Sequence, residues 1–181
     1  MSSEWDYFFR AQQGDELAWR VLIEQYQTRL AALALLITGS ATAADDVVQE
    51  TFVRAFGAKI RNRSGTVRGF LGTIAYRLAL KESKRQRRNV EFDGLNLPDR
   101  SQSPLESVLK AERDRLVTEA IGKLDREHRD VLVLRFYGGH SYEEIAELVK
   151  VPLGTVKSRI FYAVKSCREI LRQKGVLDDA H

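Results

Sequence analysis

Residues 140–171 read HSYEEIAELVKVPLGTVKSRIFYAVKSCREIL and predict two helices joined by a tight turn. Ser141 is a typical helix N-cap residue, and Glu144, three positions later, completes a capping box. Pro152 ends the first helix because it lacks an amide hydrogen and restricts the residue before it. The second helix is expected to begin near Gly154. This pattern indicates a helix-turn-helix, a motif whose second helix enters the major groove of DNA.

The second helix has one apolar stripe with helical spacing, and we expect that stripe to be buried. It consists of Val156, Ile160, Ala163, Val164, Cys167 and Leu171. Outside the stripe lie the candidate DNA-reading residues Thr155, Lys157, Ser158, Arg159, Phe161 and Lys165. An ordinary helical hairpin with a solvated basic face is the alternative. Phe161 favours the interpretation as a DNA interface. An aromatic ring is not expected on a solvated face, but at the edge of DNA it can contact a thymine methyl group.

The composition gives no support to an enzyme, and no cofactor or metal is expected. Of the 181 residues, 44% are hydrophobic and 30% are charged, as is usual for a globular protein. A single cysteine, Cys167, excludes an internal disulfide and a cysteine-based zinc site. The three histidines (His128, His140 and His181) have no metal-site spacing. A phosphate-binding glycine loop and a nucleophile elbow are both missing from the sequence.

We expect a cytoplasmic protein that does not insert into a membrane. One cysteine in the whole chain fits a reducing compartment. The first residues do not resemble a secretory signal. The longest apolar run, Leu30–Ile37, is too short to span a bilayer.

Positive charge is concentrated in two segments. Residues 77–88 hold six cations and one anion, and residues 154–172 hold five cations and one anion. Together they carry a net charge of +9. Because the whole chain carries +4, the remainder carries −5. Two basic segments on an acidic body predict two contacts with a polyanion.

The first half of the chain predicts four helices. A short one covers residues 5–14, and a long amphipathic one runs from about Ala18 to Gly39. Ser40 or Thr42 caps the third, ATAADDVVQETFVRAF, whose expected core residues are Val47, Val48, Thr51, Phe52, Ala55 and Phe56. Its outer side carries Asp45, Asp46, Gln49 and Glu50. Taken alone, these residues are typical of a solvated helix with acids near its N-terminus.

The fourth helix follows a glycine-rich, basic loop and begins near Val67. Its expected core face is Phe70, Leu71, Ile74, Ala75 and Leu78. A cationic stripe follows at Arg77, Lys81, Lys84 and Arg88. Six cations within twelve residues favour phosphate binding over a frayed, solvated helix end.

Residues 89–102 have no helical periodicity and contain Gly94 and Pro98, so they predict a flexible linker. Ser103 to Glu106 form a capping box that begins the second domain. A helix through Leu124 and another over about 126–137, packing Val131, Leu132, Leu134 and Phe136, precede the helix-turn-helix. The predicted fold is all-α. It has two small helical domains, 1–88 and 103–181, joined by the linker.

Three motifs in this order resemble a bacterial extracytoplasmic-function (ECF, group 4) sigma factor of the sigma-70 family. ADDVVQETFVRAF resembles the helix that binds the clamp of core RNA polymerase, and VRGFLGTIAYRLALKESKRQRR resembles the segment that reads the −10 element. LDREHRDVLVLRFYGGHSYEEIAELVKVPLGTVKSRIFYAVKSCREIL resembles the domain that reads the −35 element. The resemblance covers about residues 12–172.

The resemblance implies an alternative sigma factor that binds core polymerase and directs initiation at specific promoters. Asp45, Asp46, Gln49 and Glu50 would dock on the clamp of the largest subunit. The −10 strand would be held by Tyr76, Arg77, Lys81, Lys84, Arg85 and Arg88. The recognition helix would read the −35 element through the residues named above. An anti-sigma factor is an expected further partner.

The chain departs from the family pattern at four positions. Phe70 stands where Trp is usual, and Arg77 and Lys81 stand where Asn and Asp are common. Lys150 replaces the glycine of the turn and would adopt a left-handed conformation there. A stand-alone helix-turn-helix regulator is the second interpretation. It explains the C-terminal half but gives the first domain no role.

Overall fold

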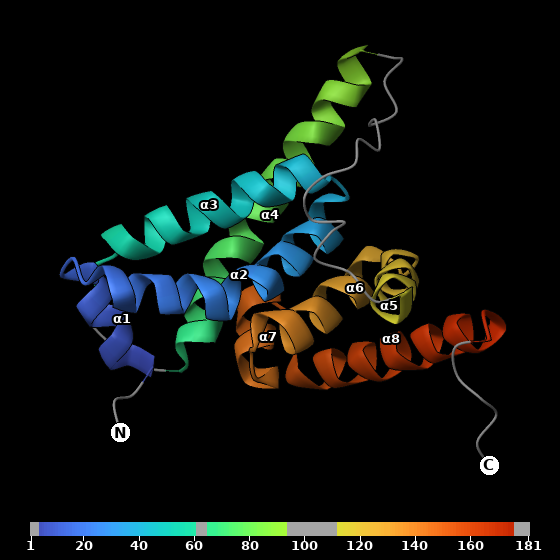
Figure 1. Ribbon diagram of the computed structural model, residues 1–181. Coiled ribbons are helices and arrows are strands. Elements are labelled where there is room, and N and C mark those ends of the chain that lie inside the picture. The colour runs from blue at the N-terminus through green and yellow to red at the C-terminus, as the bar shows by residue number, and fades with distance from the viewer. Residues whose placement is uncertain (1–3, 61–64, 94–111, 176–181) are drawn as a thin grey trace.

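The computed structural model describes residues 4–60, 65–93 and 112–175, and every regular element in these ranges is a helix (Figure 1). The all-α prediction is therefore confirmed. The elements are α1 (Glu4–Gln12), α2 (Glu16–Thr38), α3 (Ala41–Gly57), α4 (Val67–Asp93), α5 (Glu112–Gly122), α6 (Arg126–Val133), the π-helix η2 (Leu134–Gly138), α7 (Tyr142–Val149) and α8 (Leu153–Gln173).

Helix α2 is the centre of the N-terminal half, and α1, α3 and α4 pack around it. Asp15 caps it, since its Oδ1 accepts the Ala18 amide hydrogen at 3.0 Å. Gly39 ends it in the left-handed conformation, with φ of 70°. Nearly every side chain in its last two turns, residues 30–37, is buried. The apolar run seen in the sequence is thus a core helix that is covered on all sides.

Two aromatic groups fix the helices around α2. Trp5 contacts Phe8, Phe9 and Phe70, and its Nε1 donates to the Gly65 carbonyl at 3.1 Å. On the other side, Trp19 meets two phenylalanines of α3, Phe52 and Phe56. The sequence predicted Phe56 in the core, but this ring is 45% exposed. It lies in the last turn of α3, where its ring packs against Trp19.

The predicted helix over 126–137 is two elements, α6 and η2. In a π-helix the hydrogen bonds run from residue i to i+5, so each residue turns through a smaller angle than in an α-helix. Apolar spacing read at 3.6 residues per turn therefore fails after Leu134. Phe136, predicted as core, is 55% exposed, whereas Leu134 and Gly138 are buried.

The helix-turn-helix is confirmed at α7 and α8. Ser141 Oγ accepts the Glu144 amide hydrogen at 3.1 Å, and the Glu144 carboxylate accepts the Ser141 amide hydrogen at 2.7 Å. Helix α8 begins at Leu153 with Pro152 as its N-cap residue, one position before the predicted start. Its buried residues are Val156, Ile160, Ala163 and Leu171, while Val164 and Cys167 are half-buried.

Lys150 has the only positive φ among the described non-glycine residues, at 58°. Left-handed backbone is unfavourable for residues with a Cβ atom. We expect Lys150→Gly to stabilise the protein by about 1 kcal/mol. The thermal midpoint should then rise by roughly 2–4 °C in a chain of this size. Lys123→Gly is the control, because that exposed residue has no such strain; it should lower the midpoint or leave it unchanged.

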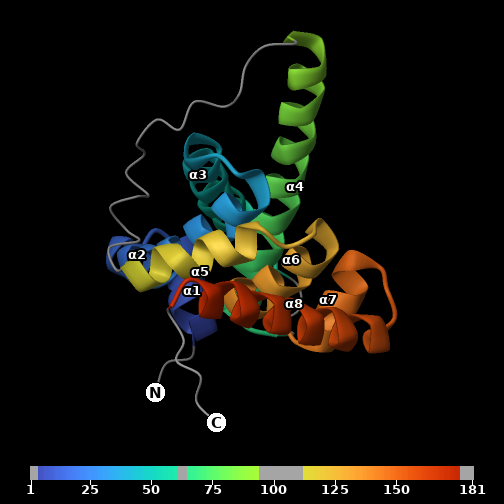
Figure 2. The same ribbon diagram turned by 90° about the vertical axis from the view of Figure 1, so that its right-hand side faces the viewer.

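The two halves pack directly against each other. Helix α6 and η2 lie against α2, and η2 also lies against α4 (Figure 2). Leu33, Leu71 and Leu134 are all fully buried within one continuous apolar cluster.

Helix α4 continues to Asp93, so residues 89–93, predicted as linker, are helical. The rest of the predicted linker and the capping box at Ser103 lie outside the described residues. None of the described helices has the length and apolar character that crossing a bilayer requires.

Candidate nucleic-acid interface

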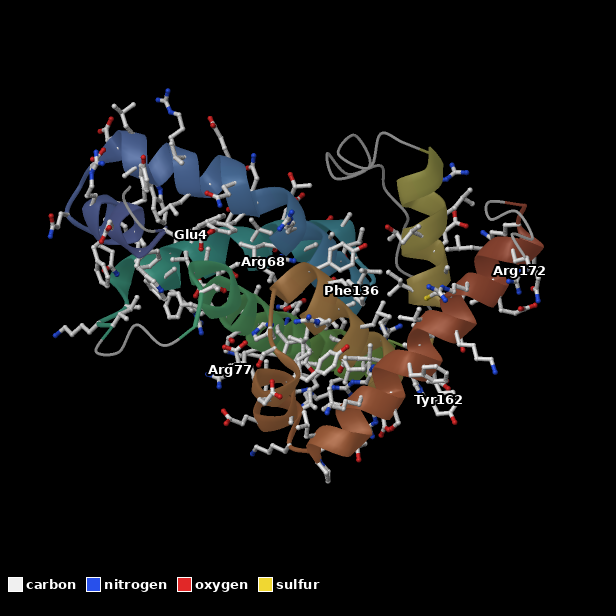
Figure 3. The ribbon with its side chains drawn as sticks, turned by 90° about the horizontal axis from the view of Figure 1, so that it is seen from below. Glu4, Arg68, Arg77, Phe136, Tyr162 and Arg172 are labelled. Atoms are coloured by element: carbon white, nitrogen blue, oxygen red, sulfur yellow. The ribbon has the colours of Figure 1, made fainter. Side chains whose placement is uncertain are left out.

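Helix α8 presents an exposed polar and aromatic face opposite its buried stripe. Lys157, Ser158 and Lys165 are exposed, and Phe161 is 64% exposed. Tyr162, which the sequence analysis did not include, is 55% exposed and packs edge-on against Phe161 at 5.4 Å between ring centroids. Figure 3 shows Tyr162 on the outer side of α8. This face combines cations, a hydroxyl group and two aromatic rings on a rigid helix.

Two of the predicted α8 residues are less accessible. Arg159 forms an ion pair with Glu127 of α6, and its side chain is only 20% exposed. Thr155 is half-buried, and its carbonyl accepts a hydrogen bond from Ser158 Oγ at 3.0 Å. Arg159 therefore joins α8 to α6 and would have to leave a carboxylate partner in order to reach a base.

The cationic stripe of α4 is exposed, as the sequence predicted. Arg77, Lys81, Lys84, Arg85 and Arg88 all lie on the surface. Arg85 is held by Glu82 through two hydrogen bonds of 2.9 and 3.0 Å. This contact with Glu82, and more weakly the charge of Asp46, raise the pKa of Arg85. The remaining cations form a row on one helix, which suits a phosphate backbone.

Tyr76 is placed differently from the rest of the predicted −10 set. It is only 4% exposed, and its hydroxyl donates to Asp130 Oδ2 of α6 at 2.9 Å. Burial raises the pKa of Tyr76, and the Asp130 charge adds to that shift. Burial also raises the pKa of Asp130, against the opposing effects of Tyr76 and Arg126. In this arrangement the Tyr76 ring cannot contact a DNA strand.

His140 lies at the same junction and is 2% exposed. Its Nε2 is 2.9 Å from Thr73 Oγ1 of α4, and its Nδ1 is 3.2 Å from the Leu134 carbonyl oxygen. Burial lowers the pKa of His140. The nearby Arg68 charge acts in the same direction, while Glu144 and the backbone carbonyls of Leu134 and Gly69 oppose it. From the sequence, His140 could be assessed only as a possible metal ligand. The described residues contain no metal-binding group of three or more ligands.

Because the folded protein holds His140 with a lowered pKa, its stability should depend on pH. Unfolded histidine titrates near pH 6.5. The unfolded chain then binds more protons as the pH falls through 6.5, so the free energy of unfolding should decrease. Urea denaturation at pH 7.5 and 5.5 measures this decrease, and His140→Gln should reduce it. Asp130 is present in both proteins, so its contribution to the pH dependence of the free energy of unfolding cancels when the two are compared. His128→Gln, at a histidine outside this junction, is the control, and an equal loss of the pH dependence in that variant would contradict the assignment to His140.

The outer side of α3 carries the predicted polymerase-binding residues. Asp46 and Gln49 are exposed, and Asp45 and Glu50 are half-buried. Glu50 is paired with Arg54 at 2.6 Å. Beside them lies an apolar groove that was not predicted from the sequence, a cleft of about 780 Å³ between α2 and α3. Its lining includes Trp19, Val48, Phe52, Val53 and Phe56, together with Gln49. Exposed Val53, one turn after Gln49, was the sequence signal for this groove.

Two parts of the chain match known protein families. Sigma-70 region 2 matches residues 22–89, and Sigma-70 region 4 matches residues 120–169. The ECF RNA polymerase sigma factor SigL of Mycobacterium tuberculosis is 36% identical over 164 residues, covering 87% of this chain and 90% of that protein.

Solved structures of other proteins share the fold, and two complexes are among them. One is the sigma factor RpoE in complex with the anti-sigma factor NepR from Bartonella quintana. It has a TM-score of 0.66 and 22% identity, and the match covers 85% of this chain and 96% of that one. The other is CnrH in complex with the cytosolic domain of CnrY. It has a TM-score of 0.60 and 26% identity, covering 92% of this chain and 96% of that one.

Proposed function

The chain belongs to the ECF sigma factors of the sigma-70 family and directs promoter-specific transcription initiation; we propose that separate exposed surfaces bind core polymerase, the −10 element and the −35 element. Proteins of this kind are initiation factors and not enzymes. The N-terminal domain, about residues 1–88, would bind polymerase and the −10 element, and the C-terminal domain, about 103–181, would bind the −35 element.

The −35 element would be read by the outer face of α8. The observation that carries this assignment is the exposure of Lys157, Ser158 and Phe161 on a helix whose opposite side is buried. A helix presented in this way fits the major groove, where lysine can contact guanine or phosphate and an aromatic ring can contact a thymine methyl group. Tyr162 joins this set because it packs against Phe161.

The opened −10 strand would be held by α4. Arg77, Lys81 and Lys84 would contact phosphates, since they are exposed along one helix. Single-stranded DNA is bound by cations together with aromatic rings on which bases stack. Tyr76 is the ring that the family resemblance assigns to this role, and it must leave Asp130 before it can act.

The clamp of core polymerase would dock on α3. Asp46 and Gln49 supply exposed polar contacts, and the groove between Trp19 and Phe56 supplies apolar area beside them. An interface of this composition, a polar rim around an apolar centre, is usual for protein partners. The complementary surface would carry cations beside an apolar ridge.

An anti-sigma factor is the further partner that we propose. The solved structure of RpoE, which shares this fold, holds that sigma factor together with the anti-sigma factor NepR. CnrH, which also shares the fold, is held in complex with the cytosolic domain of CnrY.

Run-off transcription with purified core polymerase tests the function as a whole. Adding this chain should produce a transcript from promoter DNA selected with the reconstituted holoenzyme, and core polymerase alone should produce none. A stand-alone helix-turn-helix regulator cannot replace the promoter-specificity subunit. No transcript, together with operator binding as a dimer, would support that regulator instead.

A further inference from the structure

We propose that the contact between α4 and the segment η2–His140 is autoinhibitory: it keeps Tyr76, the aromatic member of the −10-reading set, buried against the C-terminal half and leaves the −35-reading face of α8 free. This proposal rests on the proposed function for its DNA-binding consequences. The closed arrangement itself is a property of the isolated chain.

One face of α4 supplies side chains that bond to the other half. Arg68 donates from its guanidinium to the carbonyls of Phe136 and Tyr137, one of these bonds being 3.3 Å long. Thr73 meets His140, and Tyr76 meets Asp130, as described above. Figure 3 shows Arg68 and Phe136 at the junction of the halves. These three α4 residues form hydrogen bonds with the C-terminal half, so part of the helix proposed to read the −10 element is occupied by a contact within the protein.

The helices approach so closely here that only glycine fits. A Cβ atom built on Gly72 would lie 2.7 Å from the Gly138 carbonyl oxygen and 2.9 Å from the Gly138 Cα. It would also lie 3.0 Å from Cε1 of His140. All three atoms belong to the opposite half. Gly72 is therefore the position at which a single methyl group would separate the halves.

Acidic side chains of the C-terminal half face the cationic helix across a cleft of about 610 Å³. Phe70, Thr73, Ile74 and Arg77 of α4 line one side, and Glu144 and Glu147 of α7 line the other. A phosphate strand entering this cleft would meet two carboxylates. The closed form thus hides the Tyr76 ring and also places two carboxylates, Glu144 and Glu147, in the cleft that Arg77 and Lys59 line.

The outer face of α8 is outside this contact. Lys157, Phe161 and Tyr162 stay exposed while the halves are closed. The proposal therefore predicts an asymmetry. The free protein should bind double-stranded DNA through α8 and bind single-stranded DNA poorly, because only the open fraction of molecules offers Tyr76.

Gly72→Ala tests the proposal, since alanine is the better helix former and its methyl group acts on the opposite half. Small-angle X-ray scattering should give a larger radius of gyration than for the wild type. Fluorescence anisotropy with a labelled single-stranded DNA of mixed sequence should show affinity about fivefold tighter or more. Affinity for a mixed-sequence duplex should be unchanged. Gly122→Ala is the matched control, because a Cβ atom there meets nothing within 4 Å.

A folded Gly72→Ala variant with wild-type size and wild-type single-strand affinity would overturn the proposal. If Gly72→Ala does not fold, Asp130→Ala decides in the same assays, because it removes the partner of Tyr76 from the other half. The wild-type chain offers a third measurement. Saturating single-stranded DNA should speed hydrogen exchange in η2, by the reciprocity of linked equilibria, and unchanged exchange would count against the proposal.

Failure of the proposed function has a separate signature. If neither kind of DNA binds any of the proteins, the DNA-binding assignments are wrong. The scattering comparison alone then decides whether Gly72 holds the halves closed.

Discussion

Replacing Asp46 and Gln49 by lysine is expected to abolish run-off transcription while leaving the protein folded. Both side chains are exposed on α3, so the stability cost should be about 1 kcal/mol or less for each. Two new cations facing a clamp surface that complements an acidic helix should weaken core binding by about 3 kcal/mol, or roughly 100-fold. Core binding is measured by fluorescence anisotropy of labelled sigma, and folding by circular dichroism.

Gln49 is paired with Asp46 here in preference to Glu50, which is also on the predicted polymerase-binding side of α3. Reversing Glu50 with Asp46 would also break the Glu50–Arg54 ion pair and would confuse the two effects. The matched control is Glu24→Lys with Thr28→Lys, an exposed pair on α2 outside the groove. It adds two lysines and should transcribe normally. Normal transcription by the folded α3 variant would remove the clamp assignment.

Lys157→Ala combined with Phe161→Ala should impair DNA binding and leave polymerase binding intact, which is the reverse of the result expected for the α3 variant. Core binding should persist, and affinity for −35 DNA should fall by about 2–6 kcal/mol, since a base contact contributes roughly 1–3 kcal/mol. The fold should be unaffected because Phe161 is 64% exposed and the buried stripe of α8 is untouched. Duplex binding over a range of salt concentrations is the measurement.

The salt dependence tells the two kinds of contact apart. A phosphate contact by Lys157 would weaken all sequences equally and lower the salt slope by about 1. A base contact would relax preference at one position of the −35 element. Lys123→Ala with Tyr7→Ala removes a lysine and an exposed aromatic ring elsewhere and is the control. Unchanged −35 binding by the α8 variant would mean that this helix is wrongly assigned.

The sequence predicted the elements of this fold well because helix boundaries have local signals. Ser141 with Glu144, Gly39 and Pro152 each act within a few residues, and the structure places a helix end at each. The exposed cations of α4 and the exposed side chains of α8 followed from the same periodicity. Lys150 was also placed correctly in the left-handed conformation.

The contact between the halves could not be predicted in this way. It joins residues such as Tyr76 and Asp130, which lie 54 positions apart and leave no periodic signal. Phe136 was misplaced because η2 abandons the α-helical repeat. The available clue was Gly69 followed by Gly72 within an otherwise strong helix. Two glycines three positions apart lie on one face and indicate that something packs closely there.

The close approach of Gly72 to Gly138 also limits how this protein can be re-engineered. Retargeting a sigma factor by grafting a foreign −35-reading half treats the two halves as interchangeable modules. Here such a graft would also replace Gly138, His140 and Asp130, the groups that meet α4. A chimera would therefore acquire a new promoter preference together with a new balance between its resting and active forms, and its basal output would change even at a perfectly matched promoter.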